Sequence, residues 1–269
     1  GPEHHPSLVK LALRSYSAPL ICDGTHISAD FDIMTMPICL CSGPRNVSTA
    51  LMYSFAQRPG WSVVDEPFYA AYLARTGADH PGRADVLASQ PTDPAEVWAQ
   101  LAGHPQPVYF KNMAHHMVDV DWGFLDRAAH IFWIRHPRKV IASFAKVIST
   151  VSLSDLGLQE QLHQWNALNN YSGPKILVDS DAMLTNPRRN LGAICSAIGI
   201  DFDERMLQWQ AGNKSCDGPW WPHWYNNVHK STGFGEARPL PDPLSDHLHD
   251  LEQSAMPYYN ELNAQTFNF

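Results

Sequence analysis

The sequence predicts an α/β fold, with a mostly parallel central sheet flanked by helices. Two observations support this prediction. Short runs of four to six residues are apolar at successive positions, and strands that are buried on both faces of a parallel sheet have this pattern. Stretches with helical periodicity separate these runs, and such βα alternation gives right-handed crossovers in an open sheet with helices on both faces.

Each element follows from its local pattern. The predicted strands are Met36–Cys41, Trp61–Val64, Val108–Phe110, Ile131–Ile134 and Lys175–Val178. The predicted helices are Val47–Arg58, Pro94–Leu101, Arg138–Ile148, Gln159–Leu168 and Pro187–Ile198. Two of these helices have proline in the first turn, where it is tolerated, behind Asp93 and Asn186 as N-caps. The Gly-, Pro- and Asp-rich segment Thr76–Thr92 is expected to be a loop or lid.

Composition and charge narrow the class of protein. The chain has 269 residues, of which 44% are hydrophobic and 17% are charged; this is the composition of a globular protein rather than of a disordered or collagen-like chain. The 27 acidic residues outnumber the 19 basic ones and give a formal net charge of −8. A general nucleic-acid or membrane-surface binder carries the opposite sign. Any bound anion must therefore be held by a local cluster of cations.

The N-terminal segment and the cysteines give expectations about domains and location. The five cysteines show no Cys-x-x-Cys spacing, which favours a reducing, cytoplasmic location over a disulfide framework or a zinc site. No stretch reaches the roughly 18 apolar residues of a membrane span. Gly1-Pro2 resembles the remnant of a cleaved expression tag. We expect residues 1–35 to be an N-terminal extension, partly left by such a tag, and residues 36–269 to form a single domain.

The first predicted strand leads into a candidate anion loop, Ser42-Gly-Pro-Arg-Asn-Val-Ser-Thr49. A Gly-containing turn that opens a helix presents free backbone N–H groups and the positive end of the helix dipole, which favour a phosphate or sulfate. Arg45 adds guanidinium donors, and Ser48 and Thr49 add hydroxyls. The segment lacks the G-x-x-x-x-G-K-[ST] pattern of a Walker A motif. The alternative is an ordinary strand–turn–helix with an exposed arginine.

Ionisable residues follow the second and third predicted strands. Glu66 follows the second strand and fits two different roles. It is either a general base for an acceptor hydroxyl or a structural cap or ion-pair partner. The third leads into Lys111-Asn-Met-Ala-His115-His116. A lysine there can neutralise charge on a transferring group, and an imidazole can accept a proton. Paired histidines also ligate metals, but no acidic or Cys ligand lies at helical spacing, so no metal is expected; one histidine is equally explained by core packing.

The fourth predicted strand ends in cations. Arg135 stands at its end, Arg138 and Lys139 are close behind, and Ser143 lies two turns into the following helix. In ATPases and kinases this strand end commonly carries an aspartate that holds Mg²⁺. A cationic strand end instead suits direct binding of a second anion, with Ser143 within reach of it.

Together these segments resemble the PAPS-dependent sulfotransferases, in a bacterial-type variant. Ser42–Thr49 resembles their 5′-phosphosulfate loop, and Arg135-x-Pro137-x-x-x-x-x-Ser143 resembles their 3′-phosphate motif. The resemblance spans about Met36–Gly235 and implies a P-loop NTPase-like fold and transfer of a sulfuryl group from 3′-phosphoadenosine-5′-phosphosulfate (PAPS). It assigns Arg135 and Ser143 to the 3′-phosphate. It assigns the 5′-phosphosulfate to Arg45, Asn46, Val47, Ser48 and Thr49.

The resemblance also implies catalytic residues. Some branches of the family place a glutamate base after the second strand, which makes Glu66 the first choice. Cytosolic members carry Lys-x-His where this chain has Lys111-x-x-x-His115-His116, so His115 and His116 stay open as alternative bases. Arg45, Lys111 and the loop amides are expected to stabilise the transition state without a divalent metal. Val228–Gly235 is similar to the late loop that closes over the nucleotide, which makes Lys230, Ser231 and Thr232 candidate phosphate contacts.

The acceptor is expected to be a small molecule: an alcohol, a phenol, a sterol-like compound or an amine. Four tryptophans lie within sixteen residues and are consistent either with an apolar or ring-bearing acceptor pocket or with core packing; they are Trp209, Trp220, Trp221 and Trp224. The net charge disfavours a polyanionic acceptor. Two other functions compete with sulfuryl transfer: a Mg²⁺-dependent P-loop kinase with Asp179 and Asp181 as metal ligands, and a catalytically silent nucleotide-binding protein.

Overall fold

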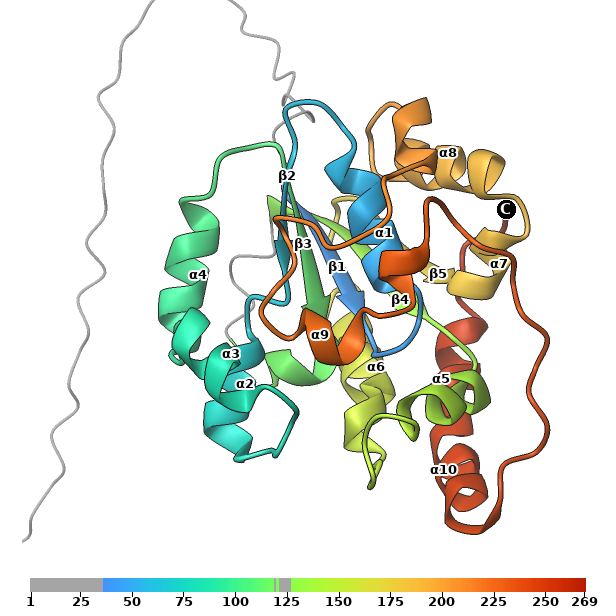
Figure 1. Cartoon of the computed structure of the whole chain (residues 1–269). Helices are drawn as coiled ribbons and strands as arrows, with labels where there is room; N and C mark the ends of the chain where they lie inside the picture. The colour runs from blue at the N-terminus through green and yellow to red at the C-terminus, as the bar shows by residue number, and fades with distance from the viewer. Residues whose placement is uncertain (1–35, 119, 121–126) are drawn as a thin grey trace, which may run out of the picture. The chain divides into compact units, whose positions relative to one another are not determined.

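The computed structural model describes residues 36–118, 120 and 127–269; the expected extension, residues 1–35, lies outside the described residues. The described chain contains a parallel sheet with the strand order β2-β3-β1-β4-β5 (Figure 1). Its strands are β1 (Ile38–Ser42), β2 (Ser62–Asp65), β3 (Val108–Met113), β4 (Ala129–Ile134) and β5 (Lys175–Asp179). The predicted parallel α/β fold is therefore confirmed, with each strand close to its predicted place.

Helices connect and flank the strands. They are α1 (Ser48–Ala56), α2 (Tyr69–Thr76), α3 (Arg83–Ser89), α4 (Pro94–Ala102), α5 (Pro137–Phe144), α6 (Leu158–Ala167), α7 (Ser180–Leu184), α8 (Pro187–Ala197), α9 (Trp221–Trp224) and α10 (Asp246–Asn263). Both predicted N-caps are confirmed: the Asp93 side chain accepts a hydrogen bond from the backbone N–H of Ala95, and that of Asn186 accepts one from Arg189. Among the described helices, none has both the length and the apolar character needed to cross a membrane.

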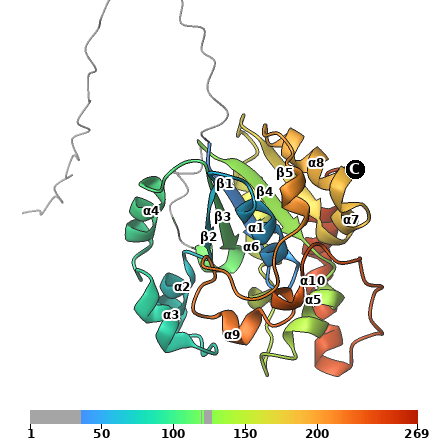
Figure 2. The same ribbon diagram turned by 45° about the horizontal axis from the view of Figure 1, so that its top comes forward.

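Two layers of helices bury the sheet because its strands are apolar at successive positions. On one face, Ile38 and Leu40 of β1 belong to a core cluster with residues of α1 and α8. On the other face, Cys41 packs with residues of α5, α6 and α10, and Cys39 packs with residues of α4. Alternate residues of one strand thus serve opposite layers, as expected of a strand in the middle of a parallel sheet (Figure 2).

The helices of the described chain differ from the sequence-based expectation in several places, among them α2, which was not predicted. The segment Thr76–Thr92, expected to be a loop or lid, contains helix α3, in which Val86 is buried. A single buried residue in seven leaves almost no periodic signal. Helix α10 was not predicted, because Pro257 interrupts its pattern and one of its few buried residues is the charged Glu252.

The strand order places the carboxyl end of β1 at a change of direction in the sheet. The chain passes from β1 to β2 and β3 on one side of it, and then crosses to β4 and β5 on the other. Ligands of open α/β sheets bind in the crevice outside the carboxyl ends of the strands at such a point. In Figure 1 the arrowheads of β1 and β3 point toward α9, which lies beyond this end of the sheet.

Gly43, directly after β1, lies where a side chain has no room. A Cβ atom built there would be 2.6 Å from the carbonyl oxygen of Leu156. We expect Gly43→Ala to lower the free energy of unfolding by about 1–3 kcal/mol, as overpacking does, measured by urea denaturation. Gly103→Ala is the matched control, because its Cβ would meet only ordinary contacts, the nearest 3.6 Å from the Ala99 carbonyl oxygen. Equal stability of the two variants would contradict the close approach at Gly43.

Candidate active site

The loop between β1 and α1 has the backbone of an anion-binding turn. Arg45 and Val47 have positive φ angles of 57° and 71°, a conformation that is strained for a β-branched residue such as Val47. The first N–H groups of α1 have no partner within the helix, and Val47, its N-cap, makes no capping hydrogen bond with its side chain. Together the open helix terminus and the strained turn favour an anion at this point.

Asn46 anchors this loop to β4. Its Nδ2 donates to the Trp133 carbonyl oxygen at 2.9 Å, and the Trp133 indole Nε1 donates back to the Asn46 carbonyl oxygen at 2.7 Å. The Ser42 hydroxyl lies 3.0 Å from Asn46 Oδ1. The side chain of Asn46 is thus committed to the protein, which leaves its backbone to face a ligand.

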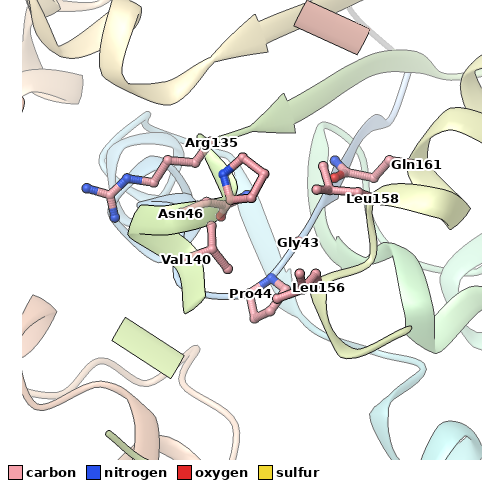
Figure 3. A pocket seen from close by; sticks show the side chains of 9 residues that line it. Gly43, Pro44, Asn46, Arg135, Val140, Leu156, Leu158 and Gln161 are labelled. Carbon is pink, nitrogen blue, oxygen red and sulfur yellow. The ribbon is translucent and has the colours of Figure 1, made fainter. Parts of the chain in front are cut away.

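The loop is also packed from behind. Figure 3 shows the residues around a cavity of about 10 Å³ on that side, among them Gly43, Pro44, Leu156 and Gln161. A space of this size holds at most one water molecule. In the same view the Arg135 guanidinium extends away from Leu158 and Gln161. The loop is therefore fixed by close packing on one side and open on the other.

Three of the predicted donor-binding residues meet at this loop: Arg45, Arg135 and Ser143. Arg135 and Ser143 lie 90 and 98 positions after Arg45 in the chain. Arg45 Nε donates to the Ser143 hydroxyl at 3.0 Å, and an Arg135 guanidinium N–H donates to the Arg45 carbonyl oxygen at 3.1 Å. A second Arg45 N–H donates to the Trp224 carbonyl oxygen at 2.9 Å. Burial, with a smaller contribution from Arg135, lowers the pKa of Arg45. Two guanidinium groups held this close favour an anion between or beside them.

Asp181, a metal ligand in the kinase alternative, lies among these cations. Its carboxylate accepts a hydrogen bond from Lys139 Nζ at 2.7 Å and lies 3.5 Å from Arg135 Nε. Asp179 caps α7 and accepts a hydrogen bond from the Tyr259 hydroxyl at 3.0 Å. Both acids are thus engaged with protein groups. No group of three or more His, Cys, Asp or Glu side chains among the described residues has an arrangement that could hold a metal ion.

Lys111 occupies the centre of a buried ionic network. It lies within β3 rather than after it, because β3 pairs with β1 as far as Met113. Its Nζ donates to Asp65 Oδ1 at 3.0 Å, to Glu66 Oε1 at 2.8 Å and to the Tyr225 hydroxyl at 2.7 Å. An ammonium group has three donors, so the network uses all of them.

One ammonium between two carboxylates leaves a net negative charge in a buried place. Burial raises the pKa of Glu66 above its ordinary value and Asp65 raises it further, although Lys111 acts in the opposite direction. Burial lowers the pKa of Lys111, but Asp65 and Glu66 outweigh it, so that this pKa is raised. Lys111 therefore stays charged, and Glu66 is a stronger base than an ordinary glutamate.

The two histidines are neutral and buried. His116 stacks against the rings of Tyr69 and Tyr72, with centroid distances of 4.5 and 4.7 Å. Burial lowers the pKa of His115 to about 4 and lowers that of His116 well below its ordinary value. Imidazoles in this state are weak proton acceptors at neutral pH.

A cavity of about 510 Å³ joins the loop and the buried network. Most predicted site residues line it: Arg45, Asn46, Val47, Ser48, Thr49, Glu66, Lys111, His115, His116, Arg135, Ser143 and Ser231. Lys230 and Thr232 do not line it and are exposed. Of the four clustered tryptophans, Trp224 lines the cavity, whereas Trp209 and Trp220 belong to core clusters.

Sequence reasoning missed several residues of this site. Asp65 stands beside Glu66 at the end of β2, and its position at a strand end was a usable signal. Tyr225 gave none, because its partner Lys111 is 114 positions away. Two further cations that line the cavity, Lys146 and Arg238, were also missed, whereas Lys139 was expected near the second anion.

Removal of the Lys111 charge tests the ionic network. We expect Lys111→Met to lower the free energy of unfolding by about 3–5 kcal/mol, because two buried carboxylates lose their counter-ion. Lys146→Met, a change at an exposed lysine on the same cavity, is the control and is expected to have little effect in the same denaturation experiment. A stable Lys111→Met protein would show that the carboxylates do not need this cation.

Comparisons with known proteins identify relatives of this chain. Two Arabidopsis thaliana proteins, branched-chain-amino-acid aminotransferase-like proteins 1 and 2, are 35% and 33% identical to this chain over 227 residues, or 83% of it. The chain spans about 40% of the length of these relatives. Their names therefore describe proteins much longer than the matched part.

Solved structures show the same fold. The sulfotransferase domain of the Synechococcus PCC 7002 olefin synthase has a TM-score of 0.52 at 20% identity, covering 82% of this chain and 94% of that one. The sulfotransferase domain from the curacin biosynthetic pathway has a TM-score of 0.52 at 15% identity, covering 83% and 98%. A family model described as a sulfotransferase domain matches residues 36–266. The chain belongs to the sulfotransferase domain family.

Proposed function

We propose that this domain transfers a sulfuryl group from PAPS to a hydroxyl or amine of a small-molecule acceptor. The observation that carries the proposal is the meeting of Arg45, Arg135 and Ser143 at the uncapped start of α1. These residues come from two βα units, Arg45 from β1–α1 and the other two from β4–α5, and the resemblance assigns them to the two anionic ends of one nucleotide. Family membership supports transferase chemistry of this kind.

The donor end of the cavity suits the PAPS anions. The start of α1 supplies backbone N–H groups, and the side chains of Arg45, Ser48 and Thr49 lie at the same edge. Arg135, Ser143 and Lys139 stand beside them for a second anion. The resemblance assigns that second place to the 3′-phosphate, a group that ATP lacks.

Glu66 is the favoured base at the other end of the cavity. Burial raises its pKa toward neutrality, whereas burial lowers the pKa of His115 to about 4. In the transfer, the sulfur–oxygen bond to the 5′-phosphate breaks, a bond forms between sulfur and the acceptor oxygen or nitrogen, and the acceptor proton passes to Glu66. Arg45 and the loop amides stabilise charge on the transferring group, while Lys111 acts through Glu66.

The walls near Glu66 favour an acceptor with apolar or ring character. Tyr69, His80 and Trp224 line this end, and the Tyr69 hydroxyl is already hydrogen-bonded to His80 Nδ1 at 2.8 Å. The faces of these rings offer contact area more than hydrogen bonds. A small alcohol, phenol or amine fits this description.

Calorimetric titration with 3′-phosphoadenosine 5′-phosphate (PAP) tests the donor site. We expect PAP to bind with or without EDTA, and ATP to bind much more weakly. Arg135→Ala is expected to weaken PAP binding by about 2 kcal/mol or more, the usual contribution of a charge-assisted hydrogen bond; exposed Arg189→Ala is the control. Mg²⁺-dependent ATP binding without preference for PAP would overturn the donor assignment and favour a kinase.

Glu66→Gln tests the base. We expect the turnover number to fall by about 10²- to 10⁴-fold with PAP affinity retained, and Glu96→Gln, an exposed change on α4, to have no effect. The base acts in its ionised form, so wild-type activity should rise with pH through a midpoint above the ordinary glutamate value of 4.5. Full activity of Glu66→Gln would move the base to His115 or His116; no activity in either protein despite PAP binding would favour a silent nucleotide-binding protein.

A further inference from the structure

The buried network around Lys111 includes a residue to which neither the sequence motifs nor the family comparison assigns a role. The Tyr225 hydroxyl donates to Asp65 Oδ2 at 2.7 Å and accepts from Lys111 Nζ at 2.7 Å and from Trp220 Nε1 at 3.0 Å. The residue is buried, with 4% of its surface exposed. We propose that Tyr225, together with Asp65, is a positioning residue that orients the Glu66 base toward the cavity; this rests on the function proposed above.

Tyr225 and Asp65 determine how Lys111 meets Glu66. With one ammonium donor directed to Asp65 and one to Tyr225, a single donor remains for Glu66 Oε1. Without these partners the ammonium group would be free to turn toward both Glu66 oxygens, and the carboxylate would be aimed differently. The geometry thus divides the lysine among three acceptors and leaves the Glu66 carboxylate at the wall of the cavity.

The backbone of Glu66 is fixed independently of its side chain. Its φ angle is 40°, its N–H donates to the Lys111 carbonyl oxygen at 2.8 Å, and its carbonyl oxygen accepts from Gln90 Nε2 at 3.0 Å. A positive φ at a non-glycine residue persists only where the surroundings enforce it. What remains adjustable is the side chain. Asp65 reaches it through Lys111, and Tyr225 reaches it both through Lys111 and directly, its hydroxyl lying 3.4 Å from Glu66 Oε1.

The chain segment that carries Tyr225 also touches the donor loop. The preceding residue, Trp224, accepts a hydrogen bond from Arg45 through its carbonyl oxygen at 2.9 Å. The N–H of Gly218, from the same segment, donates to Asp65 Oδ2 at 3.2 Å. The residues that position the base are therefore held by the arginine that the proposed donor would contact.

Ionisable groups from five segments of the chain face Glu66 or its partners. Asp65 is on β2, Lys111 on β3, Tyr69 on α2 and Tyr225 in the segment after α9, and His116 lies near Lys111. Asp65 raises the pKa of Glu66, whereas the Tyr225 hydroxyl lowers it. Removal of the two groups should thus shift the Glu66 titration in opposite directions.

The test compares Tyr225→Phe and Asp65→Asn with Tyr109→Phe. Tyr109 is the matched control, because its hydroxyl is buried and has no hydrogen-bond partner among the described residues. The Glu66 titration is read from the carboxyl stretch in infrared difference spectra between each protein and the same protein carrying Glu66→Gln. This measurement needs no acceptor, so it is independent of whether sulfuryl transfer occurs.

We expect the Glu66 midpoint to move to higher pH in Tyr225→Phe, to lower pH in Asp65→Asn and not at all in Tyr109→Phe. Where transfer is measured, Tyr225→Phe should lower the turnover number by about 10- to 100-fold with the KM for PAPS unchanged. An unshifted titration in Tyr225→Phe, or a Tyr225→Phe protein that no longer folds and binds PAP, would overturn the proposal. Shifted titrations in a protein that transfers no sulfuryl group would refute the proposed function and leave the network assignment intact.

Discussion

The site depends on one buried ammonium group. Lys111 lies within the fully buried strand β3, and its burial is costly unless every donor finds a partner. Those partners come from the end of β2 and from the segment after α9. By binding them, Lys111 fixes the end of β2 and the segment after α9 relative to each other, although these two segments are far apart in the sequence.

Backbone strain is concentrated at the same place. Among the described residues, four that are not glycine have positive φ angles, and three of them line the cavity: Arg45, Val47 and Glu66. Such conformations cost free energy and are kept where function needs a particular orientation. Arg45 and Val47 belong to the anion loop and Glu66 is the proposed base, so both are held in backbone conformations that the chain alone would not favour.

The sequence was sufficient for the sheet and for the anion loop. Strands such as Ile131–Ile134 are apolar throughout, and the turn before α1 has its own local composition, so both are readable without tertiary contacts. The base network was only half readable. Glu66 and Lys111 stand at or near strand ends, but Tyr225 joins them only through the folded structure. For helix α3, the signal was absent because it buries almost nothing.

The network has a consequence for the order in which the protein folds during synthesis. The strands that carry Asp65 and Lys111 leave the ribosome more than a hundred residues before Tyr225, the residue that completes their hydrogen bonds. Until then one buried donor of Lys111 and one oxygen of Asp65 lack these partners. Contacts of such large sequence separation form late, because a long loop must close before they can be made. The sheet therefore forms first, and the hydrogen-bond network around Lys111 is completed only after the last quarter of the chain has been synthesised.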